Sequence, residues 1–231
     1  MYNISSGKGD PWQGRIDLLQ SMTGLFLWVF LCLHIFLTSS ILLGQEAMWR
    51  VSRFFEGYYF FGETYPSLVF CFAATVFALF IAHAGLTLGR FPANVGQWRA
   101  FWSHARVFRH RDTTLWIIQV ITGFAMLFLG SVHLYVILTH PEQLGPIESS
   151  VRVWTERFFP LDLLLLLVVV PHGCIGFYRF VMKWSHGLAD FRIRLRWAML
   201  GVGIVFLLLG FLALTTYIRI GIEHAAHAGL Y

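Results

Sequence analysis

Apolar residues run through the chain in five stretches. Each is long enough to cross a lipid bilayer as a helix, which takes about 20 residues. The five stretches are Met22–Leu43, Pro66–Leu88, Leu115–Leu138, Pro160–Met182 and Trp197–Ile220. The charged residues inside them are Asp162, Arg179 and Arg219, all near the ends. The pattern predicts an all-α integral membrane protein, a bundle of five transmembrane helices that forms a single membrane domain over residues 1–231.

The composition agrees with a membrane protein. Hydrophobic residues make up 57% of the chain and charged residues only 13%, whereas an ordinary soluble domain carries about 25% charged residues. The net charge of +5 does not indicate nucleic-acid binding, because the five apolar stretches argue against it. Positive connections on one side of a bilayer explain that charge better.

The distribution of basic residues predicts the orientation of the bundle. The N-terminal segment and the second and fourth connections hold eleven lysines and arginines, against four on the opposite side. The eleven are Lys8, Arg15, Arg90, Arg99, Arg106, Arg109, Arg111, Lys183, Arg192, Arg194 and Arg196. This asymmetry predicts a cytoplasmic N-terminus and a C-terminus on the opposite side. The first 21 residues are polar, so we expect no cleaved signal peptide and a multi-pass protein of the inner (cytoplasmic) membrane.

The three cysteines offer no cofactor motif. Cys32, Cys71 and Cys174 all lie inside apolar stretches, and none belongs to a Cys-x-x-Cys or Cys-x-x-Cys-His sequence. That excludes iron–sulfur ligation, a zinc site and covalent c-type haem within this chain. We expect all three to be small buried hydrophobic residues.

Four of the ten histidines lie inside apolar stretches, one in each of the first four: His34, His83, His133 and His172. A single intramembrane histidine often only hydrogen-bonds a neighbouring helix. Four of them, one per helix, indicate a shared function, because polar residues in a membrane are costly.

The depths of these histidines predict two layers. At 1.5 Å per residue from the inner end of each stretch, His83 lies roughly 8 Å deep, His172 roughly 15 Å, His34 roughly 18 Å and His133 roughly 27 Å. This predicts an inner pair, His83 with His172, and an outer pair, His34 with His133. Errors of a few residues in the boundaries leave a pairing of His34 with His83 open.

The chemistry of the four histidines favours haem over zinc. Zinc would need its ligands at one depth, usually with cysteine or carboxylate among them. A haem needs two imidazoles on opposite faces and an apolar slot. Small residues flank three of the ligands, although ordinary helix contacts explain them equally well: Ala82, Ala84, Gly85, Gly130, Ser131, Gly173 and Gly176. We therefore predict two bis-histidine haem b groups, which transfer electrons and leave no open position for oxygen.

With these four histidines, the chain resembles the dihaem cytochrome b subunits of quinol:fumarate reductases, in the succinate:quinone oxidoreductase family. The likeness covers essentially the whole chain, including intervals of 49, 50 and 39 residues between successive ligands. It implies a proximal haem on His83 and His172 and a distal haem on His34 and His133. It also implies polar contacts to the haem propionates. Those contacts are Gln20, Ser21, Trp116 and Lys183 for the proximal haem and Arg152 for the distal haem.

Simpler roles exist for several of these residues, namely helix capping for Ser21, interfacial anchoring for Trp116 and positive-inside charge for Lys183. The resemblance further implies that Glu56, in "RFFEGYYFFG", is the catalytic carboxylate that accepts a proton from quinol. The alternative for Glu56 is an exposed loop residue in an aromatic interfacial belt. The chain departs from several dihaem relatives at Val170, where they carry a glutamate proposed to relay protons.

The resemblance also implies partners. They are a flavoprotein subunit with FAD and an iron–sulfur subunit on the cytoplasmic side, with menaquinol as substrate. Fumarate would be reduced to succinate, and a dimer of heterotrimers is left open. The arginine-rich inner loops, including "FRIRLR", are the expected docking surface, with anionic lipid headgroups as the rival explanation for their charge. Other hypotheses are a succinate:quinone reductase of the same architecture, a hydrogenase- or formate-dehydrogenase-type cytochrome b, a proton-coupled transporter and a structural anchor without cofactor.

Overall fold

The computed structural model describes residues 11–88, 94–97, 99, 103, 111–185 and 191–227. All regular secondary structure in the described residues is helical, and five helices are long and apolar enough to cross a membrane. They are Trp12–Leu43, Pro66–Leu88, Asp112–Thr139, Phe159–Trp184 and Phe191–His227. The five predicted spans are confirmed, and four of the five helices extend beyond the predicted limits.

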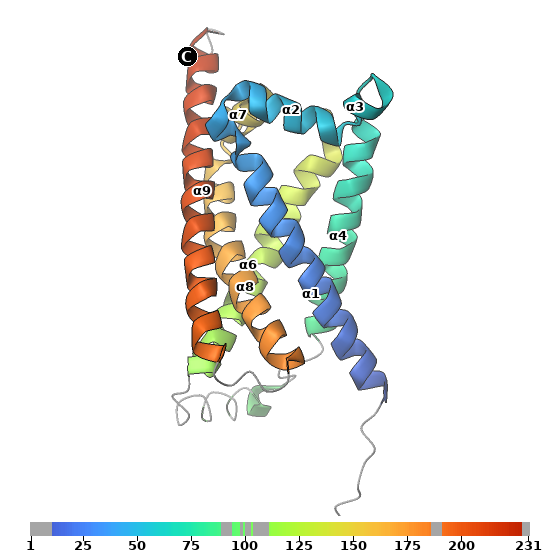
Figure 1. Ribbon diagram of the computed structural model, residues 1–231, viewed down its shortest axis with the longest axis vertical. Coiled ribbons are helices and arrows are strands. Elements are labelled where there is room, and N and C mark those ends of the chain that lie inside the picture. The colour runs from blue at the N-terminus through green and yellow to red at the C-terminus, as the bar shows by residue number, and fades with distance from the viewer. Residues whose placement is uncertain are drawn as a thin grey trace, which may run out of the picture.

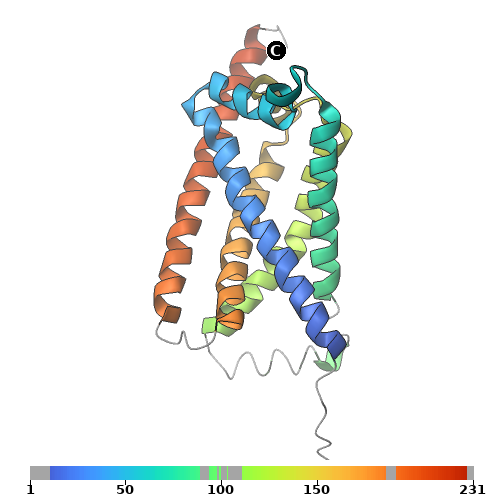
Figure 2. The ribbon, with the colours of Figure 1, turned by 45° about the vertical axis from the view of Figure 1, so that its right-hand side comes forward.

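The long helices are labelled α1 (Pro11–Thr38, continued by the 3-10 turn η1, Ser39–Leu43), α4 (Pro66–Leu88), α6 (Arg111–Thr139), α8 (Phe159–Trp184) and α9 (Phe191–His227). Helix α8 packs against α6 and α9, while α1 packs against α4 and α8. Helix α1 runs obliquely across the bundle (Figure 1), and the turned view in Figure 2 shows the same crossing. Since α1 meets both α4 and α8, it can carry side chains into the space between them.

Shorter helices whose bounds fall within the described residues are also present where the sequence predicts only connections. They are α2 (Gln45–Phe55), α3 (Tyr58–Phe61) and α7 (Pro146–Trp154). Figure 1 shows α2 and α7 lying across one end of the bundle, the end at which α9 finishes. A search for long apolar stretches misses such helices because only one side of each is buried, as at Met48 and Ser52 of α2. This end is called the outer end, and the end at which α1 begins is called the inner end, in keeping with the predicted orientation.

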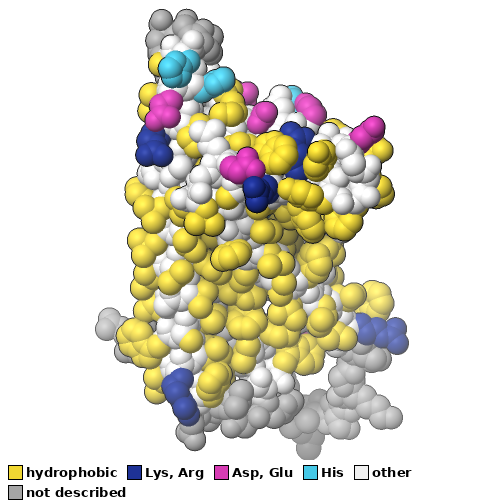
Figure 3. Space-filling view, turned by 45° about the horizontal axis from the view of Figure 1, so that its top comes forward, with side chains coloured by type: hydrophobic (Ala, Val, Ile, Leu, Met, Phe, Trp, Pro, Cys, Tyr) yellow, Lys and Arg dark blue, Asp and Glu magenta, His cyan; other side chains and the backbone are white. Residues whose placement is uncertain are grey.

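The surface between the two ends is apolar. Figure 3 shows hydrophobic side chains covering the middle of the bundle, with charged side chains gathered towards the ends. Large side chains such as Phe36 and Phe128 are about 70% exposed, as expected for groups that face lipid. Cys174 is buried and Cys32 half-buried, but Cys71 is exposed. The expectation of burial was therefore wrong for Cys71, because that side of α4 faces outwards.

Two small apolar clusters hold the helices together. One lies towards the outer end, where Ile41 and Met48 meet Val153 of α7 and Tyr217 of α9. The other joins α1 to α8 and consists of Trp28, Leu31, Ile35, Val170 and Cys174. Val170 is 0% exposed within it. The position at which the resemblance would lead one to expect a glutamate is therefore packed among apolar side chains.

Candidate cofactor site

A cavity of about 1150 Å³ lies between the long helices. This is more than the roughly 300–1,000 Å³ typical of a pocket for one small-molecule ligand. All four predicted ligands, His34, His83, His133 and His172, line it. The cavity therefore gathers the intramembrane histidines of four different helices around one continuous space.

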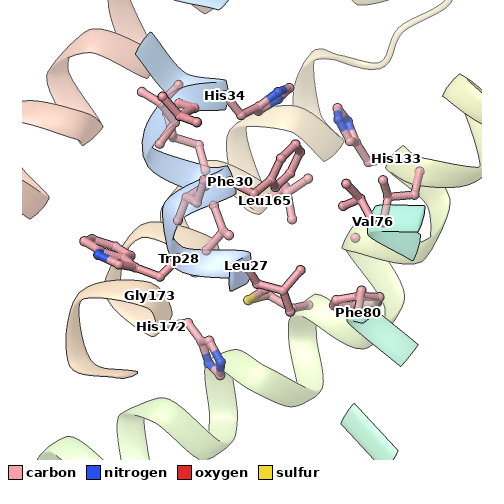
Figure 4. Close-up of a pocket in the computed structure, with 18 of the residues that line it drawn as sticks. Leu27, Trp28, Phe30, His34, Val76, Phe80, His133, Leu165, His172 and Gly173 are labelled. Carbon is pink, nitrogen blue, oxygen red and sulfur yellow. The ribbon is translucent and has the colours of Figure 1, made fainter. Parts of the chain in front are cut away.

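The outer pair of histidines consists of His34 on α1 and His133 on α6. Their ring centres lie 6.2 Å apart and their planes are inclined at 80°. Figure 4 shows the two side chains pointing towards the same space, above the apolar side chains of Phe30 and Leu165. Two imidazoles that share a metal at about 2 Å per metal–nitrogen bond would have ring centres roughly 6 Å apart. The His34–His133 spacing thus suits two ligands on opposite sides of one ion.

The inner pair of histidines is held by hydrogen bonds to neighbouring helices. The Nδ1 atom of His83 lies 3.2 Å from the Thr23 hydroxyl of α1. His172 Nδ1 lies 3.0 Å from the carbonyl oxygen of Gln119 and 3.2 Å from the Thr122 hydroxyl, both on α6. Both rings line the same cavity. Both imidazoles are therefore anchored through Nδ1.

These anchors decide which ring nitrogen is free. A carbonyl oxygen only accepts hydrogen bonds, so Nδ1 of His172 donates to Gln119 and Nε2 carries the lone pair. On the outer level, Nδ1 of His133 lies 3.2 Å from Oδ1 of Asp162, and an ionised carboxylate also only accepts. Nε2 is then available as a metal ligand on one histidine of each pair. Metal-binding histidines usually donate their other ring N–H to a carboxylate or carbonyl in this way.

Two glycines pack directly against the inner histidines. A Cβ atom on Gly24 would lie 2.9 Å from Cε1 of His83, and one on Gly123 would lie 3.1 Å from Cε1 of His172. The flanking glycines noted in the sequence make other contacts. Gly130 meets Phe80 and Gly173 meets Trp28, while Gly85 has no such neighbour within 4 Å. No sequence signal separated Gly24 and Gly123 from the other glycines, because each acts on a histidine of another helix.

The predicted propionate contacts at the inner end, Gln20, Ser21, Trp116 and Lys183, all line the cavity. Lys183 donates a hydrogen bond to the Ser21 hydroxyl at 3.3 Å and forms an ion pair with Asp17. Gln20 donates to the Thr87 hydroxyl at 3.2 Å. The structure therefore places polar donors from α1, α6 and α8 around the inner end of the cavity.

Arg179 adds a cation that sequence reasoning did not assign to the site. Its guanidinium donates to Oε1 of Gln119, and both side chains line the cavity. Placing an arginine inside a membrane span costs free energy, so its presence there is a sequence signal for a functional residue. The place of Arg179 near the end of the stretch hides this signal, because charged residues are common at the ends of membrane helices. Arg179 thus joins the polar groups near His172.

At the outer end, Arg152 of α7 also lines the cavity. It donates to the carbonyl oxygen of Gln143 at 3.3 Å and to the hydroxyl of Ser149 at 3.4 Å. Burial lowers the pKa of Arg152. Nearby negative charges oppose this shift, and Asp162 has the largest effect among them. Arg152 and Asp162 therefore act on each other beside the outer histidines.

Glu56 closes helix α2 and is only 3% exposed. The alternative of an exposed loop glutamate is therefore wrong. Its Oε2 accepts a hydrogen bond from Nη1 of Arg53 at 2.7 Å. Burial raises the pKa of the Glu56 carboxyl, while Arg53 acts in the opposite direction and Glu148 raises the pKa further. Phe54 and Phe55, which precede Glu56 in the chain, line the cavity, whereas Glu56 itself is not among the lining residues.

The basic segment expected to dock partners is partly engaged within the chain. Arg192 and Arg196 pair with Asp112 of α6 at 3.4 and 3.1 Å, and Arg196 also donates to the Tyr178 hydroxyl at 3.4 Å. Four residues of the predicted inner basic set, Lys8, Arg90, Arg106 and Arg109, lie outside the described residues.

Comparisons with known proteins agree with one another. A family model described as the succinate dehydrogenase/fumarate reductase transmembrane subunit matches residues 97–212. Fumarate reductase cytochrome b subunits of two Helicobacter pylori strains are 42% identical over 228 residues, which is 96% of this chain and 88% of each relative. The protein of the same name from Wolinella succinogenes is 48% identical over 171 residues, 74% of this chain and 67% of the relative.

Proposed function

This chain belongs to the family of succinate dehydrogenase/fumarate reductase transmembrane subunits, and from that premise we propose that it is a dihaem cytochrome b that oxidises menaquinol. In this proposal it anchors an iron–sulfur subunit and a flavoprotein at its cytoplasmic inner end, where fumarate is reduced to succinate. The named relatives are fumarate reductase subunits, which favours this direction over succinate oxidation.

The observation that carries the proposal is the arrangement of the four histidines. They line one cavity in two pairs, and Nδ1 of His133 and of His172 meets an acceptor that leaves Nε2 unprotonated. Donors that suit carboxylates gather at both ends, with Lys183 and Arg179 at the inner end and Arg152 at the outer end. The residues present therefore fit two haem b groups with propionates at opposite ends.

When bound, the haems would supply one-electron redox chemistry. The protein itself would hold each haem in an apolar slot, fix the histidine tautomers and accept the protons released by the quinol. Oxidation of a quinol releases two electrons and two protons, so a proton acceptor must stand beside the quinol. Glu56 is the carboxylate we assign to this role, because it is buried near the outer end with a raised pKa.

A reduced-minus-oxidised optical spectrum of the complete purified complex, with pyridine haemochrome quantitation, tests the proposal. We expect two low-spin b haems per copy of this chain. A spectrum without haem bands would contradict the proposal and favour a transporter or a structural anchor.

A further inference from the structure

Asp162 is an intramembrane carboxylate with a specific partner. It lies in the first turn of α8, and its Oδ1 is 3.2 Å from Nδ1 of His133 on α6. The two residues are 29 positions apart in the chain, so the contact comes from the packing of two helices. The side chains are 23% and 32% exposed, and part of that exposure faces the cavity that both residues line.

The local structure fixes the position of Asp162, and a nearby cation acts on its charge. Its backbone N–H donates to the carbonyl oxygen of Phe158 at 3.0 Å, which fixes it in the first turn of the helix. The positive end of a helix dipole lies there and favours a carboxylate. Arg152 of α7 lines the same cavity, and the negative charge of Asp162 acts on its guanidinium. The start of α8 thus positions the Asp162 side chain beside Nδ1 of His133.

The other anchored histidines meet neutral groups. His172 Nδ1 bonds the Gln119 carbonyl and the Thr122 hydroxyl, and His83 Nδ1 meets the Thr23 hydroxyl. A carboxylate acceptor makes an imidazole a stronger electron donor to a metal than a neutral acceptor does. A stronger donor favours the oxidised iron, and hydrogen bonding around the ligands is one of the ways in which a protein sets a haem potential.

We propose that Asp162 is a positioning residue for His133, and that through its hydrogen bond it makes the outer haem harder to reduce than the inner haem. This inference rests on the proposed function, because it requires a haem between His34 and His133. It also gives a direction. A lower potential at the outer level, on the side of Glu56, makes electron transfer towards the inner level favourable.

The test is a redox titration of the complete complex, followed optically, with Asp162→Asn compared with the wild type. Asparagine keeps the size of the side chain but removes its charge. We expect both haems to remain bound. The midpoint potential of one haem should rise by at least about 59 mV, which corresponds to a tenfold shift in its one-electron oxidised-to-reduced equilibrium. The shifted midpoint should be the one that disappears in His34→Ala, since that variant lacks an outer ligand.

The matched control is Glu156→Gln. Glu156 is an exposed carboxylate at the same end of the bundle that also acts on Arg152, so its loss changes the local charge without touching His133. We expect both midpoints to stay at their wild-type values. If Asp162→Asn leaves both midpoints unchanged, moves both equally, or has no more effect than Glu156→Gln, the inference is wrong.

A conservative variant covers the case in which Asp162→Asn loses a haem. If Asp162→Glu then restores two haems with wild-type midpoints, the carboxylate is what His133 needs and the inference holds. If Asp162→Glu also loses the outer haem, the size of the side chain decides the site and the inference is overturned. A wild-type complex without two haems would instead contradict the proposed function, so the two failures are distinct.

Discussion

Gly24 of α1 lies directly against the imidazole of His83 on α4, where an added Cβ atom would come within 2.9 Å of Cε1. Gly24→Ala should therefore push the ring aside or force the two helices apart, at a cost of about 1–3 kcal/mol. We expect partial loss of the inner haem and a lower melting temperature, measured by pyridine haemochrome and by thermal unfolding of the complex.

The control for this variant is Gly85→Ala, two residues beyond His83, where an added Cβ meets nothing within 4 Å. That change should be neutral or slightly stabilising, because alanine suits a helix better than glycine by roughly 0.5–1 kcal/mol. Equal haem content and equal melting temperatures in the two variants would show that Gly24 does not support His83.

The pairing of the histidines gives a second prediction. His83→Ala and His172→Ala should each remove the same haem, and His34→Ala and His133→Ala should each remove the other, because each pair shares one site. The remaining haem is identified by its midpoint potential and its low-spin spectrum. Loss of the same haem from His34→Ala and His83→Ala would instead establish the pairing that depth in the sequence had left open.

Removal of the Glu56 carboxylate is the third prediction. Glu56→Gln should keep both haems and lower the rate of menaquinol oxidation by about 100-fold or more, the usual contribution of a general base. Haem content and quinol turnover are measured on the same preparation. Normal turnover in this variant would remove Glu56 from the mechanism.

The pH dependence of quinol oxidation follows from the surroundings of Glu56. A carboxylate accepts a proton only when it is deprotonated, so turnover is present above its pKa and is lost as the pH falls through it. Burial raises that pKa and Arg53, at 2.7 Å, holds it down. Arg53→Gln should therefore move the acid limb of the rate profile to higher pH, and Glu148→Gln should move it to lower pH.

Arg50→Gln is the matched control for the pH profile. Arg50 lies on the same helix as Arg53 and pairs at 3.0 Å with Glu46 on the exposed side of α2. The acid limb should stay in place in this variant. A shift as large as that of Arg53→Gln would mean that general surface charge, and not the contact with Glu56, controls the profile.

The five spans and the intramembrane histidines could be predicted from the sequence because the hydrocarbon core of a membrane restricts both backbone structure and polar side chains. Long apolar stretches must be helical there, and a polar ring within them stands out. Contacts between helices were not readable. His133 and Asp162 are 29 residues apart and His83 and Gly24 are 59 apart, so each contact depends on how two helices rotate and cross. The short helix α7 was missed because it is only half apolar.

The contact between Gly173 and Trp28 gives the last prediction, which concerns stability. A Cβ atom on Gly173 would lie 2.7 Å from Cε3 of Trp28. The indole is 9% exposed and stacks on Phe177 at 5.5 Å, so it has little room to retreat. Gly173→Ala should destabilise the bundle by about 1–3 kcal/mol, measured by unfolding in detergent.

Two comparisons separate this clash from a general effect of alanine. Gly201→Ala on α9, where an added Cβ meets nothing within 4 Å, should not destabilise the bundle. Trp28→Phe removes ring atoms at the point of contact. The cost of Gly173→Ala should therefore be smaller in the Trp28→Phe background, and the difference is the coupling energy of the pair. If the two costs are equal, the steric contact between α1 and α8 does not limit how closely these helices pack beside His172.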